Sequence, residues 1–237
     1  MRTRFQQALD ELRQRLLLMG GLAEQAVDRA CRAYTERDLT ICHMVLEGET
    51  QINAAEREID ELAFDLLAMQ QPMAVDLRFI MAVIKINSDL ERVGDQAVNI
   101  TERVMDLVEM PAEELPVDIP RMATAVGAMV RRALESFIEG KAELAMAVLE
   151  MDNVIDRMRD EAFIMLVKTM NERPQATRQA LDALLVTRNL ERVADHATNI
   201  AEDVIFWVQG ADVRHNVHPE ESQPADSVRP TSRASGL

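Results

Sequence analysis

Acidic side chains spaced three and four residues apart form rows on several segments of this chain. One row consists of Glu91, Asp95, Asn99 and Glu102, and a second, 100 residues later, of Glu191, Asp195, Asn199 and Glu202. Two further segments carry Glu49, Asn53, Glu56 and Asp60 in one and Asp152, Asp156 and Asp160 in the other. At about 100° per residue, helical geometry places each row on one narrow face. Carboxylate and amide oxygens are the donors that hard cations prefer, so the rows suggest metal sites.

Repetition of the rows decides between two interpretations. Carboxylates four residues apart on a helix repel each other by a few tenths of a kcal/mol. A solvated acidic surface is the simpler interpretation, because the formal net charge is -15. The pattern Glu-x-x-x-Asp-x-x-x-Asn-x-x-Glu occurs twice, however, and this favours divalent or iron ions, with Fe, Mn, Mg, Zn and Ca all open. The predicted ligands are Glu91, Asp95, Asn99, Glu102, Glu191, Asp195, Asn199, Glu202, Asp152, Asp156, Glu49 and Asn53.

Recognisable catalytic motifs are missing from the sequence. It has no glycine-rich phosphate loop, Gly-x-Ser-x-Gly or Cys-x-x-Cys, so we predict that it is not an enzyme. One alternative is a carboxylate-bridged di-metal enzyme built in a helical bundle, which would need inward-facing Glu-x-x-His motifs that this chain lacks. Another is a metal-free acidic docking scaffold, whose binding would depend on salt and not on chelators.

Four basic or histidine side chains near the rows need separate interpretations. His43 and His196 are expected to have surface or hydrogen-bonding roles, since neither has a histidine partner at helical metal spacing. Arg92 and Arg192 each follow a row glutamate. We expect both arginines to pair with neighbouring acids, with steering of a phosphate as the alternative.

Six long helical segments must carry these features. Apolar residues recur at spacings of three and four, and prolines and glycines such as Pro72, Pro174 and Gly210 interrupt the pattern. We predict helices over residues 3–34, 38–70, 74–109, 121–139, 141–170 and 175–208. Residues 111–120 contain three prolines and are predicted to form an extended linker.

The third and sixth segments are near copies of each other. Residues 90–104 and 190–204 are identical at ten of fifteen positions. The duplication predicts an all-α fold of two tandem three-helix bundles related by pseudo-twofold symmetry. We assign residues 1–110 to the first bundle, 111–120 to the linker, 121–210 to the second bundle and 211–237 to a flexible polar tail. Consecutive long helices should lie antiparallel, so the two acidic rows of each half should face one another.

Composition argues against several partners and locations. The 41 Asp and Glu against 26 Lys and Arg repel nucleic acid and anionic membrane surfaces. The longest run without a charged residue is ten residues, 66–75, whereas a membrane-spanning helix needs about 20 apolar residues. No secretory signal pattern is present. We therefore expect a cytoplasmic protein in which Cys31 and Cys42 are small buried residues.

Three motifs also carry a family resemblance. They are QQPMAVDLR at 70–78, DLERVGD at 89–95 and NLERVADHATNIAE at 189–202. The sequence resembles the PhoU family of phosphate-specific transport system accessory proteins over residues 4–210. The resemblance implies a cytoplasmic pair of three-helix bundles, often dimeric, that binds metal clusters through E(D)xxxD motifs. These motifs map onto Glu91 with Asp95, Glu191 with Asp195, Asp152 with Asp156 and, more loosely, Glu49 with Asn53, where asparagine replaces the final aspartate.

The resemblance further implies a regulatory role. Such a protein would be a negative regulator of the phosphate-starvation response and of phosphate uptake. It would relay the state of the phosphate ABC transporter, through the ATPase subunit, to a phosphate-sensing histidine kinase. A homodimer is implied, and membrane association would be peripheral, only through these partners.

Overall fold

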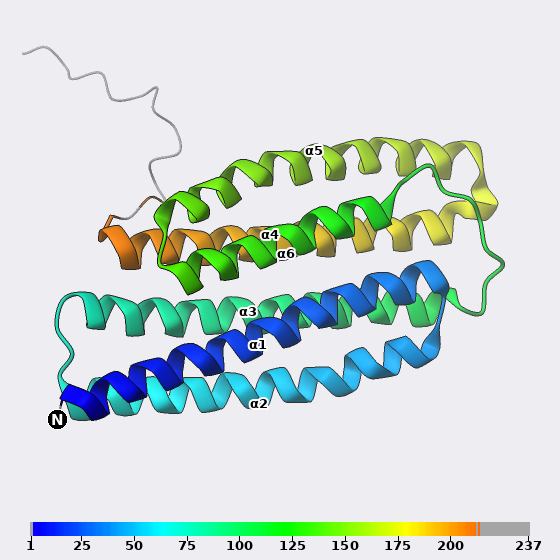
Figure 1. Ribbon diagram of the computed structural model, residues 1–237. Coiled ribbons are helices and arrows are strands. Elements are labelled where there is room, and N and C mark those ends of the chain that lie inside the picture. The colour runs from blue at the N-terminus through cyan, green and yellow to red at the C-terminus, as the bar shows by residue number, and fades with distance from the viewer. Residues whose placement is uncertain (1, 212, 214–237) are drawn as a thin grey trace, which may run out of the picture.

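The computed structural model describes residues 2–211 and 213, and every regular element in them is helical. The elements are α1 (Arg2–Glu36), α2 (Leu39–Gln70), α3 (Val75–Leu107), α4 (Ile119–Glu139), α5 (Ala142–Glu172), the short 3-10 helix η1 (Pro174–Ala176) and α6 (Thr177–Gln209). Helices α1 to α3 form one three-helix bundle and α4 to α6 the other (Figure 1). The predicted all-α fold is confirmed. The tail assigned to 211–237 lies outside the described residues except for positions 211 and 213.

Local side chains and glycines set the helix ends close to the predicted positions. The carboxylate of Asp38 accepts the backbone N–H two residues on at 2.7 Å, and that of Asp118 accepts the N–H three residues on at 3.0 Å. Gly140 and Gly210 end α4 and α6 at φ values of 60° and 71°, which glycine adopts without strain. Helix α4 begins two residues earlier than predicted because Pro120 fits a first helical turn.

The two bundles meet along their central helices. Helix α3 packs on α6 and α1 on α4, while α2 and α5 lie on the outer edges (Figure 1). One hydrophobic core runs through both bundles. The rings of Phe79, Phe137 and Trp207, from α3, α4 and α6, have centroids 5.2 to 5.8 Å apart. The guanidinium of Arg13 in α1 lies 5.2 to 5.9 Å from these rings, so all four central helices meet at this end of the molecule.

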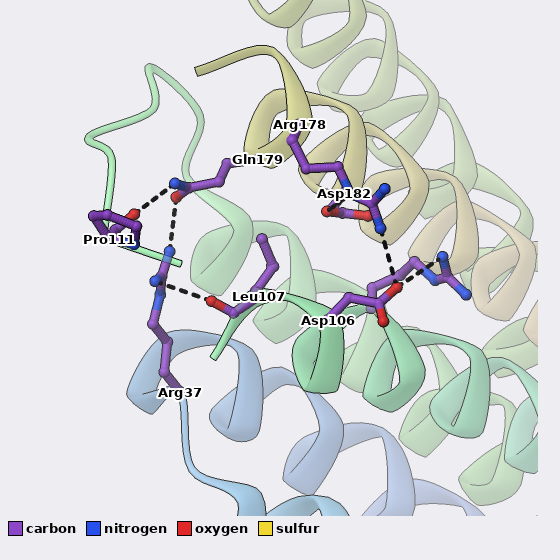
Figure 2. Close-up of polar contacts among 8 residues, drawn as sticks. Arg37, Asp106, Leu107, Pro111, Arg178, Gln179 and Asp182 are labelled. Atoms are coloured by element: carbon purple, nitrogen blue, oxygen red, sulfur yellow. Dashed lines mark hydrogen bonds and ion pairs between the residues drawn. The ribbon is translucent and has the colours of Figure 1, made fainter. Parts of the chain in front are cut away.

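Polar contacts fasten the linker at the opposite end. Arg37, just after α1, donates a hydrogen bond to the carbonyl of Leu107 at 3.3 Å (Figure 2) and another to the carbonyl of Met110 at 2.6 Å. The same guanidinium donates to the side-chain oxygen of Gln179 in α6 at 2.7 Å, and Gln179 donates to the carbonyl of Pro111. One arginine and one glutamine thus hold the start of the linker against both bundles.

Among the residues described, none of the helices combines the length and apolar character needed to traverse a bilayer.

Candidate metal-binding seams

In each bundle, the acidic rows of two neighbouring helices lie along a shared boundary, which we call a seam. The first seam, between α2 and α3, consists of Glu49, Asn53, Glu56, Glu91 and Asp95. The second seam, between α5 and α6, consists of Asp152, Asp156, Arg159, Glu191 and Asp195. Eight of the twelve predicted ligands therefore lie on these two boundaries.

Crowded negative charge marks the first seam. The Glu91 side chain is 19% exposed, and its pKa is raised by burial and then by the neighbouring carboxylate of Asp95. Glu56 and Glu49 of α2 raise the pKa of Glu91 further, which shows that the rows face each other. Arg92 partly offsets this effect from the rim, where it lies 3.5 Å from Glu91 and 3.6 Å from Asp95.

A glycine and a buried amide fix the spacing of the first seam. A Cβ at Gly94 would lie 3.0 Å from Cδ1 of Ile52, so glycine lets α2 approach α3 closely here. Asn87 is fully buried and donates to the carbonyl of Glu56 at 2.9 Å and to the carboxylate of Asp60 at 3.0 Å. The backbone of α2 is thereby tied to α3 beside the acidic row.

The second seam perturbs its carboxylates more strongly. Burial, followed by the charges of Glu191 and Asp152, raises the pKa of Asp195 to about 6, although part of this side chain faces solvent. His196 opposes the shift and Asp156 adds to it. Burial, then Asp156 and Glu191, also raises the pKa of Asp152.

A guanidinium within the second seam was not among the predicted site residues. Arg159 lies 3.3 Å from the carboxylate of Asp156, 3.2 Å from Asp160 and 3.9 Å from Glu191. Six of the seven buried positions of α2 correspond to buried positions of α5 that lie 103 residues later in the chain. In that register Arg159 stands where the first seam has Glu56. An alignment of α2 with α5 was the signal that could have found it.

Four predicted ligands lie outside the two seams: Asn99, Glu102, Asn199 and Glu202. At 1.5 Å per residue, Glu102 is about 16 Å along α3 from Glu91, too far to share an ion with it. The side-chain amide of Asn99 donates to Gln96 at 3.5 Å, and the carboxylate of Glu102 lies 3.6 Å from Arg103. Glu202 stands equally far from Glu191 along α6.

Asn199 belongs to the contact between the bundles. Its side-chain amide donates to the carboxylate of Asp89 in α3 at 3.2 Å, and Nδ1 of His196 lies 2.8 Å from the same oxygen. The hydrogen-bonding role predicted for His196 is confirmed, and His43 is exposed on α2 as predicted.

The seams supply metal-type donors without a complete ligand cluster. Within residues 2–211 and 213, no three Asp, Glu, His or Cys side chains converge closely enough to hold an ion as they stand. Each seam nevertheless presents carboxylates from two helices along one boundary. Burial is the main cause of the raised pKa values of Glu91, Asp152 and Asp195, and repulsion from neighbouring carboxylates adds to it; a cation would relieve that repulsion. The donor chemistry fits a hard metal ion, and metal binding stays a prediction.

Comparisons with known proteins match most of the helical part of the chain. The family model described as the PhoU domain matches residues 16–104 and 119–204. The phosphate-specific transport system accessory protein PhoU homolog of Pseudomonas putida is 42% identical over 214 residues, which are 89% of this chain and 83% of that protein. The crystal structure of PhoU from Pseudomonas aeruginosa has a TM-score of 0.84 at 39% identity, over 87% of this chain and 100% of that chain. The structure of the phosphate transport system regulatory protein PhoU from Streptococcus pneumoniae has a TM-score of 0.80 at 27% identity, over 88% and 99% of the chains.

Proposed function

Because this chain belongs to the PhoU family, we propose that it is an accessory regulatory protein of a phosphate-specific transport system. In finer terms, it is a negative regulator of the phosphate-starvation response and of phosphate uptake. It acts as an adaptor, in homodimeric form, between the ATPase subunit of the phosphate ABC transporter and a phosphate-sensing histidine kinase. The observation that carries the proposal is the match of the PhoU domain to both bundles.

The outer helices support an adaptor role. Phe64 and Met69 on α2 are 57% and 68% exposed, and Phe163 and Ile164 on α5 are 52% and 67% exposed. Large apolar side chains this exposed are suited to docking, because a partner surface can bury them. With one such helix on each outer edge, the body can contact two partners at once (Figure 1).

The seams are the second element of the proposal. Carboxylates of Glu49, Glu56, Glu91 and Asp95 would hold a divalent or iron ion in the first seam. The carboxylates of the second seam would do the same beside Arg159. A bound ion supplies positive charge that relieves the repulsion within each seam and can complete a docking surface for an acidic partner group.

A genetic experiment tests the regulatory role. Deletion of the gene should leave a phosphate-starvation reporter switched on in phosphate-rich medium, and the wild-type gene should restore repression. The double variants F64K/M69K and F163K/I164K should each fail to repress, and each should lose copurification with one of the two partners, while circular dichroism shows an intact helical fold. Normal repression in the deletion strain would contradict the proposal.

A further inference from the structure

A cavity of about 380 Å³ opens between α3 and α6, where the two bundles meet. Its polar lining consists of Arg103, Arg188, Arg192, Asn99, Asn189 and Glu102. Three guanidinium groups and two amides thus share a site with one carboxylate. In a chain of net charge -15, such a concentration of positive charge is unusual and attracts anions.

The two cavity arginines on α6, Arg188 and Arg192, have no partner within the described part of the chain. Arg188 and Arg192 lie one turn apart on the helix, and among residues 2–211 neither makes a hydrogen bond or an ion pair. Like charges at this spacing repel by a few tenths of a kcal/mol. Arg103 of α3 is held in place by Glu102 at 3.6 Å and Asp106 at 3.5 Å. Asp106 in turn pairs with Arg178 of α6 at 3.3 Å (Figure 2).

The pseudo-twofold counterpart of this cavity lacks the free positive charge. At an offset of 100 residues, Arg103 corresponds to Asp203 and Arg188 corresponds to Ser88. Asp203 pairs with Lys85 at 3.3 Å. Arg92, the counterpart of Arg192, pairs with seam carboxylates instead of lining a basic cavity. The basic cavity is therefore a local feature and not a consequence of the repeated fold.

We propose that this cavity binds a phosphoryl-type oxyanion, either inorganic phosphate or a phosphomonoester. Guanidinium groups bind phosphate oxygens in paired, charge-assisted hydrogen bonds, and the amides of Asn99 and Asn189 add neutral donors. The anion bridges Arg103 on α3 and the two arginines on α6, so its binding ties the bundles together. The cavity volume is at the lower end of small-molecule sites, large enough for a group attached to the phosphate.

Binding to the full chain tests this inference independently of the regulatory role. Inorganic phosphate and phenyl phosphate are titrated by calorimetry at constant ionic strength, with EDTA present so that metal ions in the seams cannot bridge the anion. We expect saturable binding that weakens at least about tenfold in R188Q/R192Q and changes less than about twofold in R92Q, the matched arginine of the other bundle. R192K should retain part of the affinity, because it keeps the charge without the planar fork.

Two further measurements distinguish the outcomes. Phosphate should raise the Tm of the wild-type chain but not of R188Q/R192Q, whose fold is checked by circular dichroism. Phenyl phosphate binding about tenfold tighter than phosphate assigns the site to a phosphoryl group carried on a larger molecule, whereas tighter phosphate binding assigns it to the free ion. Failure of both probes to saturate, equal binding to R188Q/R192Q, or an equal response to chloride would overturn the inference.

Discussion

The two seams share a backbone register and differ in how their negative charge is balanced. Each has four carboxylates spread over two antiparallel helices, but the position of Glu56 in the first seam is occupied by Arg159 in the second, and that of Asn53 by Asp156. Buried residues at matching positions maintain the helix packing in both bundles. The duplicated core therefore constrains the fold while the seam residues are free to change charge.

The difference predicts unequal affinity for cations. In the second seam Arg159 already pairs with Asp156 and Glu191, so an entering ion competes with an internal cation. In the first seam the positive charge comes from Arg92 on the rim, which is 59% exposed and easily displaced. The first seam should therefore be the better metal site, even though Asn53 replaces an aspartate there.

The largest expected effect is on bound metal. E91Q/D95N should lower the affinity of the tightest site at least about tenfold, equivalent to about 1.4 kcal/mol, while E191Q/D195N removes only a weaker site. Elemental mass spectrometry on protein purified without an affinity tag, followed by metal titration, measures both. E102Q serves as a control, because this acid lies outside the seams.

Metal content and partner binding together distinguish a metal site from a metal-free acidic docking surface. If neither seam holds metal, and if partner binding weakens with salt but ignores chelators, the seams are metal-free docking surfaces. If E191Q/D195N loses the tighter site, the comparison between the seams is wrong.

The second prediction concerns the pH dependence of stability. The pKa of Asp195 is about 6 in the folded chain against 3.8 for the free side chain, so the folded state binds the proton more tightly. The resulting stabilisation is fully present below about pH 4 and is lost as the pH rises through about 6. D195N should therefore be more stable than the wild type at pH 7 by about 1 kcal/mol, after allowance for solvent screening.

Urea unfolding at pH 4 and pH 7 measures this difference. The wild-type chain should lose more stability than D195N between the two values, and D95N supplies the matching substitution in the first seam. Parallel curves for wild type and D195N would show that the second seam does not perturb Asp195.

The third prediction concerns the removal of the charged side chains by which the two seams differ. R159Q removes the internal cation and should destabilise the second seam by about 0.5 to 1 kcal/mol, since these pairs are partly exposed. E56Q removes a repelling carboxylate at the matching position and should stabilise the first seam by a few tenths of a kcal/mol. Chemical denaturation should give opposite signs; equal signs would mean that the seam charges do not determine these effects.

The fold could be predicted from sequence because its signals are local. Apolar spacing marks the helices, and Pro72, Pro174 and Gly210 interrupt the chain where the structure also breaks between helices or ends one. The repeat of residues 90–104 at 190–204 then implies two equivalent bundles. The errors at the ends have local causes too, such as the tolerance of a first helical turn for Pro120.

The site was only partly predictable because a helical projection discards height along the axis. Glu102 and Glu91 have similar angular positions around the axis of α3 but lie at different positions along it. Asn199 points toward the other bundle, whose position no local sequence pattern specifies. The contribution of Arg159 depends on the register between α2 and α5. The unpaired state of Arg192 likewise depends on the packing of α3 against α6.

The smallest expected effect compares the two arginines that follow the first glutamate of each seam. Both were expected to pair with neighbouring acids; the ion pairs of Arg92 confirm this for the first bundle, whereas Arg192 has no such pair among the described residues. R92Q should therefore cost a few tenths of a kcal/mol, as exposed pairs do. R192Q should be neutral or slightly stabilising in phosphate-free buffer, since it relieves repulsion from Arg188. Equal destabilisation by both substitutions in chemical denaturation would show that Arg192 is paired in solution, and the contrast between the two bundles at this position would disappear.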